Sequence, residues 1–367
     1  MTQSLTKRNF GLSYCRALAT IAIITLHIGF VLSTTFNFVL SDKIALRMFV
    51  NCSMWAVPIF LMVTGVLNLD PDKTLTISKL VKKYIYRIFL SIVIFVAIYQ
   101  IVDILIENKN FNLVQEILLY LENLYRGRTY SPMWYLYMLI GLYLMMPMYR
   151  AFVKVGSDSE IKFVLLVYVL FISIIPTIGV FKFSSGFYIH ELTIYPFYMI
   201  LGYILSSELV KISQFKSAII FISSSILLLI LTYVRWKLNI KDLEVFWGYS
   251  SIIVILQSVG IFNVIVKMDS SRRKTNNKYN PQEINSSINK IKNLFSRLLL
   301  KIDTCSFGIY LIHIIVIRIF VSMDIARTII NVTSIHIIIP LLTISILLIS
   351  YITTKVLKKF PVFKFIL

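Results

Sequence analysis

Long apolar segments recur along the whole of this 367-residue chain. At about 1.5 Å of rise per residue, each could cross the roughly 30 Å hydrocarbon core of a bilayer as a helix. Only helices and closed barrels satisfy their backbone groups there. We expect ten spans, at about 11–33, 46–68, 84–106, 132–150, 162–180, 193–210, 217–234, 246–266, 303–322 and 333–354. The predicted fold is therefore an all-α, polytopic transmembrane helix bundle.

The distribution of charge supports a membrane protein over a nucleic-acid-binding one. Charged residues make up 15% of the chain and hydrophobic residues 58%, whereas soluble domains carry about 25% charged residues. If the N-terminus is cytoplasmic, roughly two thirds of the 37 lysines and arginines fall in cytoplasmic segments. The net charge of +20 then follows from topology. We expect both termini in the cytoplasm, the lipid bilayer as a partner, and no nucleic acid.

We expect a single membrane domain over 1–367, with no extracytoplasmic domain. Its longest polar stretch, at 267–302, is predicted to be a basic cytoplasmic loop whose second half forms an amphipathic helix on the inner leaflet. The outer stretch at 107–131 contains LVQEILLYLENLY, which is too short and acidic to span. We predict an interfacial or re-entrant helix there. Any chemistry is then expected within the bundle, on its short loops, or with a partner.

Arg16 and His27 interrupt the first apolar segment, GLSYCRALATIAIITLHIGF. An arginine inside a membrane helix costs about 2.5–3.5 kcal/mol on the insertion scale, so such residues are functional-site candidates. Eleven residues return a helix to within roughly 20° of the same face, about 16 Å further along its axis. His27 is suited to general acid–base chemistry. The structural alternatives are an interhelical hydrogen bond for His27 and a snorkelling Arg16.

Weaker candidates occur in later segments. His313 lies one turn after Tyr310 and is expected to form an interhelical hydrogen bond or to be a second site residue. Trp134 and Tyr135 begin the fourth span, where interfacial anchoring competes with stacking on a sugar ring. His190 and Glu191, in a short outer loop, fit a solvated pair better than an acceptor site.

The cysteines and acidic residues indicate no metal site. Cys15, Cys52 and Cys305 fall in or beside spans, with a spacing that matches neither a disulfide framework nor a metal site. We expect them to pack as small apolar residues. No metal or permanently bound cofactor is expected.

An ordered set of segments resembles the acyltransferase 3 family of integral-membrane O-acyltransferases. Arg16 and His27, within RNFGLSYCRALATIAIITLH, match the family's Arg/Lys-x10-His motif in its first helix. The other segments similar to the family are VPIFLMVTG at 57–65, MWYLYMLIGLYLMMPMYR at 133–150, YPFYMILGYIL at 195–205 and SFGIYLIH at 306–313. The resemblance runs through nearly the whole chain, and the ordered set is more specific than any one member.

Some positions depart from the family pattern. The acidic residue usual three positions before the Arg is replaced by Ser13, which leaves the partner of Arg16 undefined. The usual second-helix Ser is Thr64, which keeps a hydroxyl. Tyr84 occupies the first position of the cytoplasmic Arg-x-x-Arg, so Lys83 and Arg87 are the expected donor-binding cations unless they are ordinary positive-inside charge.

The resemblance implies acyl transfer from cytoplasmic acyl-CoA, most often acetyl-CoA, to a hydroxyl on a carbohydrate. His27 is then the catalytic base and Arg16 a second catalytic or donor-binding residue. Thr64, Trp134, Tyr135, Tyr310 and His313 are the expected substrate-binding residues. The expected acceptor is a bacterial cell-surface or capsular polysaccharide or its lipid-linked precursor, and the location is the bacterial cytoplasmic membrane.

A transporter that exports or flips a glycan or lipid-linked sugar is the alternative. Ten spans with polar residues in the bundle are compatible with both functions. The sequence lacks paired broken helices and has few intramembrane carboxylates, since Asp103 and Asp303 both fall near span ends. These features favour the enzyme.

Overall fold

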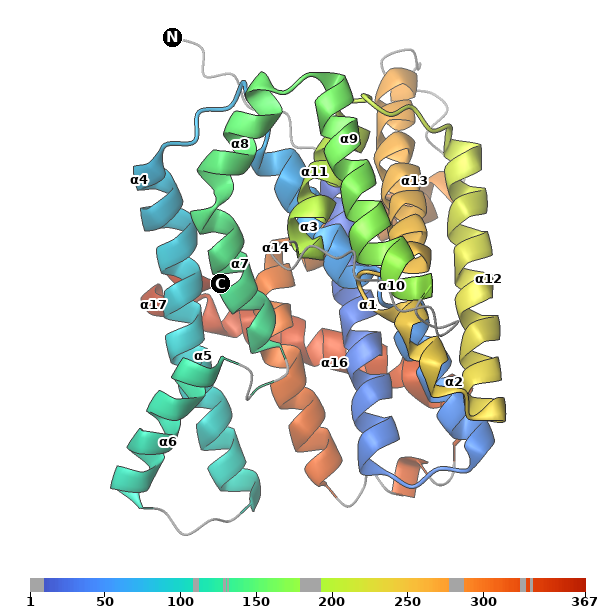
Figure 1. Cartoon of the computed structure of the whole chain (residues 1–367). Coiled ribbons are helices and arrows are strands. Elements are labelled where there is room, and N and C mark those ends of the chain that lie inside the picture. Colours follow the sequence, from blue (N-terminus) through green and yellow to red (C-terminus); the bar gives the residue numbers. More distant parts are fainter. Residues whose placement is uncertain are drawn as a thin grey trace. The chain divides into compact units, whose positions relative to one another are not determined.

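The computed structural model describes residues 10–107, 112–127, 130, 132–178, 193–276, 287–323, 328–330 and 333–367, with side chains described outside 269–276 and 287–292. Every regular element within these ranges is helical (Figure 1). The predicted all-α, polytopic helical bundle is therefore confirmed. His190 and Glu191 lie outside the described residues.

The spans agree closely with the apolar segments. Among the described residues, eight helical stretches are long and apolar enough to cross a membrane: Phe10–Thr35, Leu40–Asn68, Ile77–Glu107, Asp158–Ile178, Gln214–Leu238, Lys241–Met268, Asn293–Ser322 and Ile335–Leu357. A ninth is possible if Met133–Leu144 and Met146–Val155, bent by 51°, form one span. The sixth expected span, at about 193–210, is instead the helix Ile194–Ser206 of 13 residues. Such a helix is about 20 Å long, which is too short to cross alone.

The chain divides into two compact units, each of which is described by itself. The first comprises Met1–Ile23, Arg47–Leu67 and Ser157–Ser306. Its elements include α3 (Ala56–Asn68), α9 (Asp158–Tyr168), η2 (Val169–Ile174), α10 (Ile175–Ile178), α11 (Ile194–Ser206), α12 (Gln214–Leu238), η4 (Lys241–Trp247) and α13 (Ile252–Asn276). The second comprises Ile24–Leu46, Asn68–Gly156 and Phe307–Leu367. Its elements include α4 (Ile77–Lys79), η1 (Leu80–Ile85), α5 (Tyr86–Glu107), α6 (Leu113–Arg126), α7 (Met133–Leu144), α8 (Met146–Val155), α16 (Ile335–Leu357) and α17 (Pro361–Ile366).

Besides α3, whose last residue Asn68 falls in the second unit, three helices contribute to both units, and two of them carry the candidate site. They are α1 (Phe10–Thr35), α2 (Leu40–Cys52) and α14 (Ser287–Ser322). Helix α1 is continuous over 26 residues and contains no Pro or Gly between Gly11, in its first turn, and Gly29. Arg16 and His27 therefore belong to one helix, as the apolar pattern predicts.

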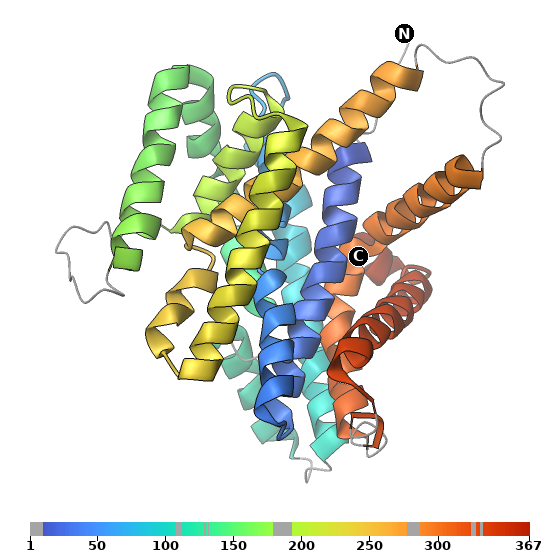
Figure 2. The ribbon, with the colours of Figure 1, turned by 90° about the vertical axis from the view of Figure 1, so that its right-hand side faces the viewer.

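Polar bonds and small residues join the helices of the first unit. Helices α12 and α13 lie side by side (Figure 2), where the Asn263 amide donates to the Ser217 hydroxyl at 2.6 Å. Helices α3 and α11 approach so closely that a Cβ on Gly65 would collide with the Met199 carbonyl, and one on Gly202 with that of Met62. Because lipid tails are as apolar as the side chains, such close backbone contacts and hydrogen bonds take over the role of a hydrophobic driving force.

Within the stretch 107–131, residues Leu113–Arg126 form helix α6 of the second unit, so the predicted helix is present. The Asn112 side chain caps α6 by accepting from the backbone N–H groups of Val114 and Gln115. The helix ends at Gly127, whose φ of 63° suits glycine. The Tyr120 hydroxyl donates to the Val93 carbonyl at 3.0 Å, which ties α6 to α5. Its interfacial or re-entrant placement stays a prediction.

Candidate active site

His27 of α1 and His313 of α14 form a hydrogen-bonded pair in the second unit. Nδ1 of His27 lies 2.9 Å from Nε2 of His313. The side chains are buried, with 8% of His27 and none of His313 exposed. Nδ1 of His313 in turn lies 3.1 Å from the carbonyl oxygen of Ile309, one turn earlier in its own helix. The interhelical hydrogen bond expected for His313 is present, and its partner is His27, the expected base.

Tyr310 and Tyr135 extend this pair into a buried cluster. The ring centroid of Tyr310 lies 5.9 Å from that of His313 and 5.6 Å from that of Tyr135. Tyr135 in turn contacts Trp134, edge to face, at 6.1 Å. Both tyrosines are buried, and the Tyr310 hydroxyl donates to the Pro132 carbonyl. We call His27, His313, Tyr310 and Tyr135 the histidine–tyrosine cluster. It brings together residues from α1, α7 and α14 that are far apart in sequence.

Arg16 pairs with Asp303 in the first unit. Its Nε lies 2.6 Å from Oδ1 of Asp303 and its Nη2 lies 3.1 Å from Oδ2. This two-point geometry is the strongest form of an arginine–carboxylate contact. The Arg16 side chain is 29% exposed, whereas that of Asp303 is 3% exposed. The partner that Ser13 does not supply therefore comes from α14.

Sequence reasoning did not identify Asp303 as this partner, although one signal was present. Asp303 precedes His313 by ten residues, and Arg16 precedes His27 by eleven. The two helices thus repeat nearly the same spacing between a charged residue and a histidine. A carboxylate inside an apolar segment is costly, so it also required a partner.

The remaining sequence-predicted residues are placed as follows. Thr64 belongs to the first unit, where its hydroxyl donates to the Phe60 carbonyl of the same helix at 2.8 Å. Lys83 is exposed in η1. Arg87, at the start of α5, donates from Nε and Nη2 to the carbonyls of Ile366 and Leu367, at 3.1 and 2.9 Å. Its guanidinium also lies over the Phe307 ring at 5.1 Å.

A second ion pair in the second unit joins Asp103 of α5 to Arg318 of α14. The Arg318 guanidinium lies 5.8 Å from the centroid of the Tyr130 ring, which stacks on Tyr99 at 4.9 Å. The Tyr130 hydroxyl is hydrogen-bonded to Asp103, and burial together with that carboxylate raises the pKa of the Tyr130 phenol. The phenol therefore stays protonated and donates to Asp103. The Asp103, Arg318, Tyr130 and Tyr99 side chains thus contact one another, and none of them belongs to the histidine–tyrosine cluster.

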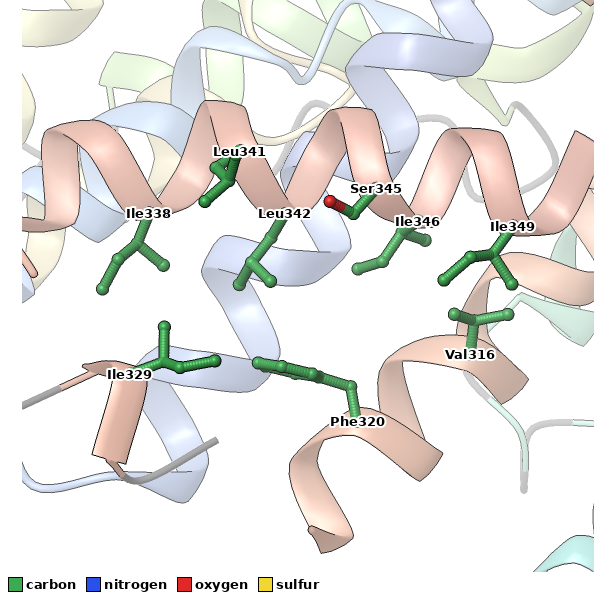
Figure 3. Close-up of a pocket in the computed structure, with 9 residues that line it drawn as sticks. All are labelled: Val316, Phe320, Ile329, Ile338, Leu341, Leu342, Ser345, Ile346 and Ile349. Atoms are coloured by element: carbon green, nitrogen blue, oxygen red, sulfur yellow. The ribbon is translucent and has the colours of Figure 1, made fainter. Parts of the chain in front are cut away.

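An apolar cavity of about 210 Å³ lies in the second unit, lined by residues of α14, α16 and the short stretch 328–330 (Figure 3). Eight of its nine lining residues are hydrocarbon side chains, and the ninth, Ser345, carries a hydroxyl. The lining suits a hydrocarbon chain rather than a charged nucleotide donor. None of the predicted site residues lines it.

The described residues contain no group of three or more His, Cys, Asp or Glu that could hold a metal ion. Cys15 and Cys305 are buried and Cys52 is half-buried, all three as free thiols. The chemistry available at the histidine–tyrosine cluster is accordingly that of an imidazole pair and two phenols.

The chain matches the family model described as "Acyltransferase domain", Acyl_transf_3, over residues 9–355. The comparisons with curated proteins and with solved structures give no match. The matched range contains both polar pairs and every predicted site residue. The chain therefore belongs to the acyltransferase 3 family and is a membrane acyltransferase.

Proposed function

We propose that this protein transfers an acyl group from acyl-CoA to a hydroxyl of a bacterial cell-surface carbohydrate. Acetyl is the favoured acyl group and succinyl is the alternative. The acceptor is a capsular or other envelope polysaccharide or its lipid-linked precursor. The observation that carries the proposal is the buried His27–His313 pair within an acyltransferase domain. A neutral imidazole held inside the bundle can remove a proton from a hydroxyl at neutral pH.

The reaction needs two proton transfers, one from the acceptor hydroxyl to His27 and one from His27 to the leaving thiolate. His27 takes the proton of the acceptor hydroxyl as that oxygen attacks the thioester carbonyl. The C–O bond forms, the C–S bond breaks, and the CoA thiolate leaves. The imidazolium of His27 then returns the proton to that thiolate. The products are an ester and free CoA, and His27 is regenerated without an oxidant, a reductant or a metal.

Arg16 and Asp303 serve the donor in this proposal. The nearly buried Asp303 carboxylate fixes two N–H groups of the guanidinium, and the exposed part of Arg16 remains accessible to an anion. An arginine held in this way binds phosphate with little loss of side-chain entropy. Lys83, which is exposed, adds positive charge for the CoA phosphates. Arg87 contributes with the part of its guanidinium that does not bind the two carbonyls.

The acceptor is assigned to the aromatic residues beside the base. Tyr310 and Tyr135 lie in the same cluster as His313, and Trp134 contacts Tyr135. Aromatic faces with a polar edge suit sugar rings. Thr64 is also proposed to bind the substrate, on the family resemblance alone.

The location follows from the same proposal. Acyl-CoA is cytoplasmic, so the donor residues must be reachable from that side, and the charge asymmetry supports a cytoplasmic location for both termini. Reporter fusions at 277–286, between α13 and α14, and in the expected outer stretch at 107–131, expressed in a bacterium, test this orientation. We expect the first to report the cytoplasm and the second the outside.

The decisive experiment follows the acyl group. The protein is reconstituted in liposomes and incubated with acetyl-CoA labelled in the acetyl group and with polysaccharide from cells that lack the protein. We expect base-labile label in the polysaccharide, as for an ester. If no label is transferred and cells without the protein accumulate unmodified glycan internally, the protein is an exporter or flippase and the proposal is wrong.

A further inference from the structure

The hydrogen-bond pattern around His313 determines where its proton lies. Its Nδ1 is 3.1 Å from the carbonyl oxygen of Ile309. A carbonyl oxygen only accepts hydrogen bonds, so a nitrogen at this distance must carry the hydrogen. Nδ1 of His313 is therefore protonated and donates along its own helix.

The second nitrogen of His313 is left with its lone pair. A neutral imidazole carries one N–H. His313 is fully buried, and the groups that contact it within the described residues, namely His27, the Tyr310 ring and the Ile309 and Tyr310 carbonyls, carry no negative charge. The Tyr310 hydroxyl donates elsewhere, to Pro132. A buried imidazolium without an anion is costly, so His313 is neutral and its Nε2 is an acceptor.

The tautomer of His27 follows from that of His313. Nε2 of His313 lies 2.9 Å from Nδ1 of His27, and because it accepts, Nδ1 of His27 must donate. We infer that His313 is a positioning residue that fixes His27 in the Nδ1–H tautomer. The basic lone pair of His27 is then on Nε2. This inference rests on the proposed function only for its catalytic meaning.

The arrangement places His313 in the role that a carboxylate holds in a Ser–His–Asp triad. His27 accepts the hydroxyl proton at Nε2, while its own Nδ1–H donates to Nε2 of His313 throughout. His313 itself neither gains nor loses a proton, because its hydrogen stays on Nδ1 and is donated to the Ile309 carbonyl. An uncharged orienting group suits a site in the membrane interior, where an unpaired carboxylate is expensive.

The test reads the two nitrogens of His27 directly. The chain has 4 histidines, so protein labelled with ¹⁵N-histidine in liposomes gives few signals, and His27→Gln assigns those of His27. Protonated and unprotonated ring nitrogens have well-separated ¹⁵N shifts. At pH 7.5 we expect Nδ1 of His27 to be protonated and Nε2 to be unprotonated. His336→Gln, at an exposed histidine, is the matched control and leaves these signals unchanged.

Two substitutions separate positioning from packing. His313→Leu keeps the apolar volume without an acceptor, and we expect His27 to populate the Nε2–H tautomer. The kcat for acyl transfer then falls roughly 10- to 100-fold with an unchanged KM for acetyl-CoA. In His313→Gln a side-chain oxygen can accept from Nδ1, and we expect the wild-type tautomer and most of kcat to return.

Either of two results overturns the inference: a protonated Nε2 on His27 in the wild-type protein, or an unchanged tautomer in His313→Leu. The NMR measurement needs no acyl transfer. If the wild-type protein transfers no acetyl group yet shows the Nδ1–H tautomer, the proposed function fails and the positioning of His27 by His313 stands.

Discussion

Helices α1 and α14 contact each other through two polar pairs that solve the same problem in different ways. In the first unit, Arg16 and Asp303 keep their charges, and the arginine stays 29% exposed at the side chain. In the second unit, His27 and His313 are almost wholly buried, and their hydrogen-bond pattern assigns each a neutral imidazole. A permanent cation inside a membrane needs an anion or access to water, whereas an imidazole needs only a correctly oriented hydrogen bond.

This difference in charge and exposure suggests different functions for Arg16 and His27, which belong to the same helix. A paired, partly exposed guanidinium can bind an anionic donor but is a poor base, because its pKa exceeds 12. A buried imidazole has a suitable basicity but attracts no phosphate. We therefore expect substitutions in the His27–His313 pair to change kcat, and substitutions in the Arg16–Asp303 pair to change the KM for acyl-CoA and the stability of the protein.

The largest expected effect is that of His27→Ala. Removal of a general base typically costs 10²–10⁴-fold in rate, so we predict a fall in kcat of about that size with donor binding unchanged. Label transfer from acetyl-CoA and equilibrium binding of CoA to the reconstituted protein are the two measurements. His336→Ala is the control, and transfer at the wild-type rate by His27→Ala would exclude the catalytic role.

Asp303→Asn is expected to have the next largest effect. It leaves Arg16 without its counter-charge, and breaking such a pair costs about 3–5 kcal/mol when it is fully buried. Because Arg16 is partly exposed, we expect about 1–3 kcal/mol, measured as a lower Tm in detergent.

The double variant Arg16→Met/Asp303→Leu separates stability from binding. Replacing both partners by apolar side chains is often neutral for stability, so its Tm should exceed that of Asp303→Asn. The KM for acetyl-CoA should rise roughly tenfold, which corresponds to about 1.4 kcal/mol. A wild-type KM in the double variant would remove Arg16 from donor binding, and a fall in kcat at constant KM would assign it to the chemical step.

Ser13→Asp gives a smaller effect whose sign depends on Asp303. Ser13 lies three residues before Arg16, on a neighbouring part of the helix surface, and is buried. With Asp303 present, a second carboxylate there is unpaired, and we expect a lower Tm. In the Asp303→Asn background it restores a partner for Arg16, and we expect about 1 kcal/mol to be recovered. Effects of equal sign in both backgrounds would show that the two positions do not share Arg16.

The sequence allowed the spans and the two α1 residues to be predicted, because both depend on local patterns. Apolar length gave the helices, and helical periodicity put Arg16 and His27 on one face. The prediction of spans was wrong at 193–210, where the apolar segment forms only the 13-residue helix Ile194–Ser206. Apolarity alone does not separate a full span from a short buried helix.

The partners of those residues could not be predicted from local patterns. Asp303 lies 287 positions from Arg16 and His313 lies 286 positions from His27, so each pairing is set by the packing of distant helices. Arg87 illustrates the same limit, since a basic cluster at a span end gave no indication of its bonds to the carbonyls of Ile366 and Leu367.

The smallest expected effect separates a structural ion pair from a functional one. Asp103 and Arg318 are paired as closely as Arg16 and Asp303, but their group includes the Tyr130 phenol and lies outside the histidine–tyrosine cluster. We predict that Tyr130→Phe lowers stability by about 0.5–1.5 kcal/mol, the net value of one hydrogen bond, and leaves kcat and the KM for acetyl-CoA unchanged. Thermal unfolding and steady-state kinetics on the same preparation measure both. A rise in the acceptor KM without loss of stability would instead place Asp103, Arg318 and Tyr130 at the acceptor. Both ion pairs would then bind substrate, the Arg16–Asp303 pair the donor and the Asp103–Arg318 pair the acceptor.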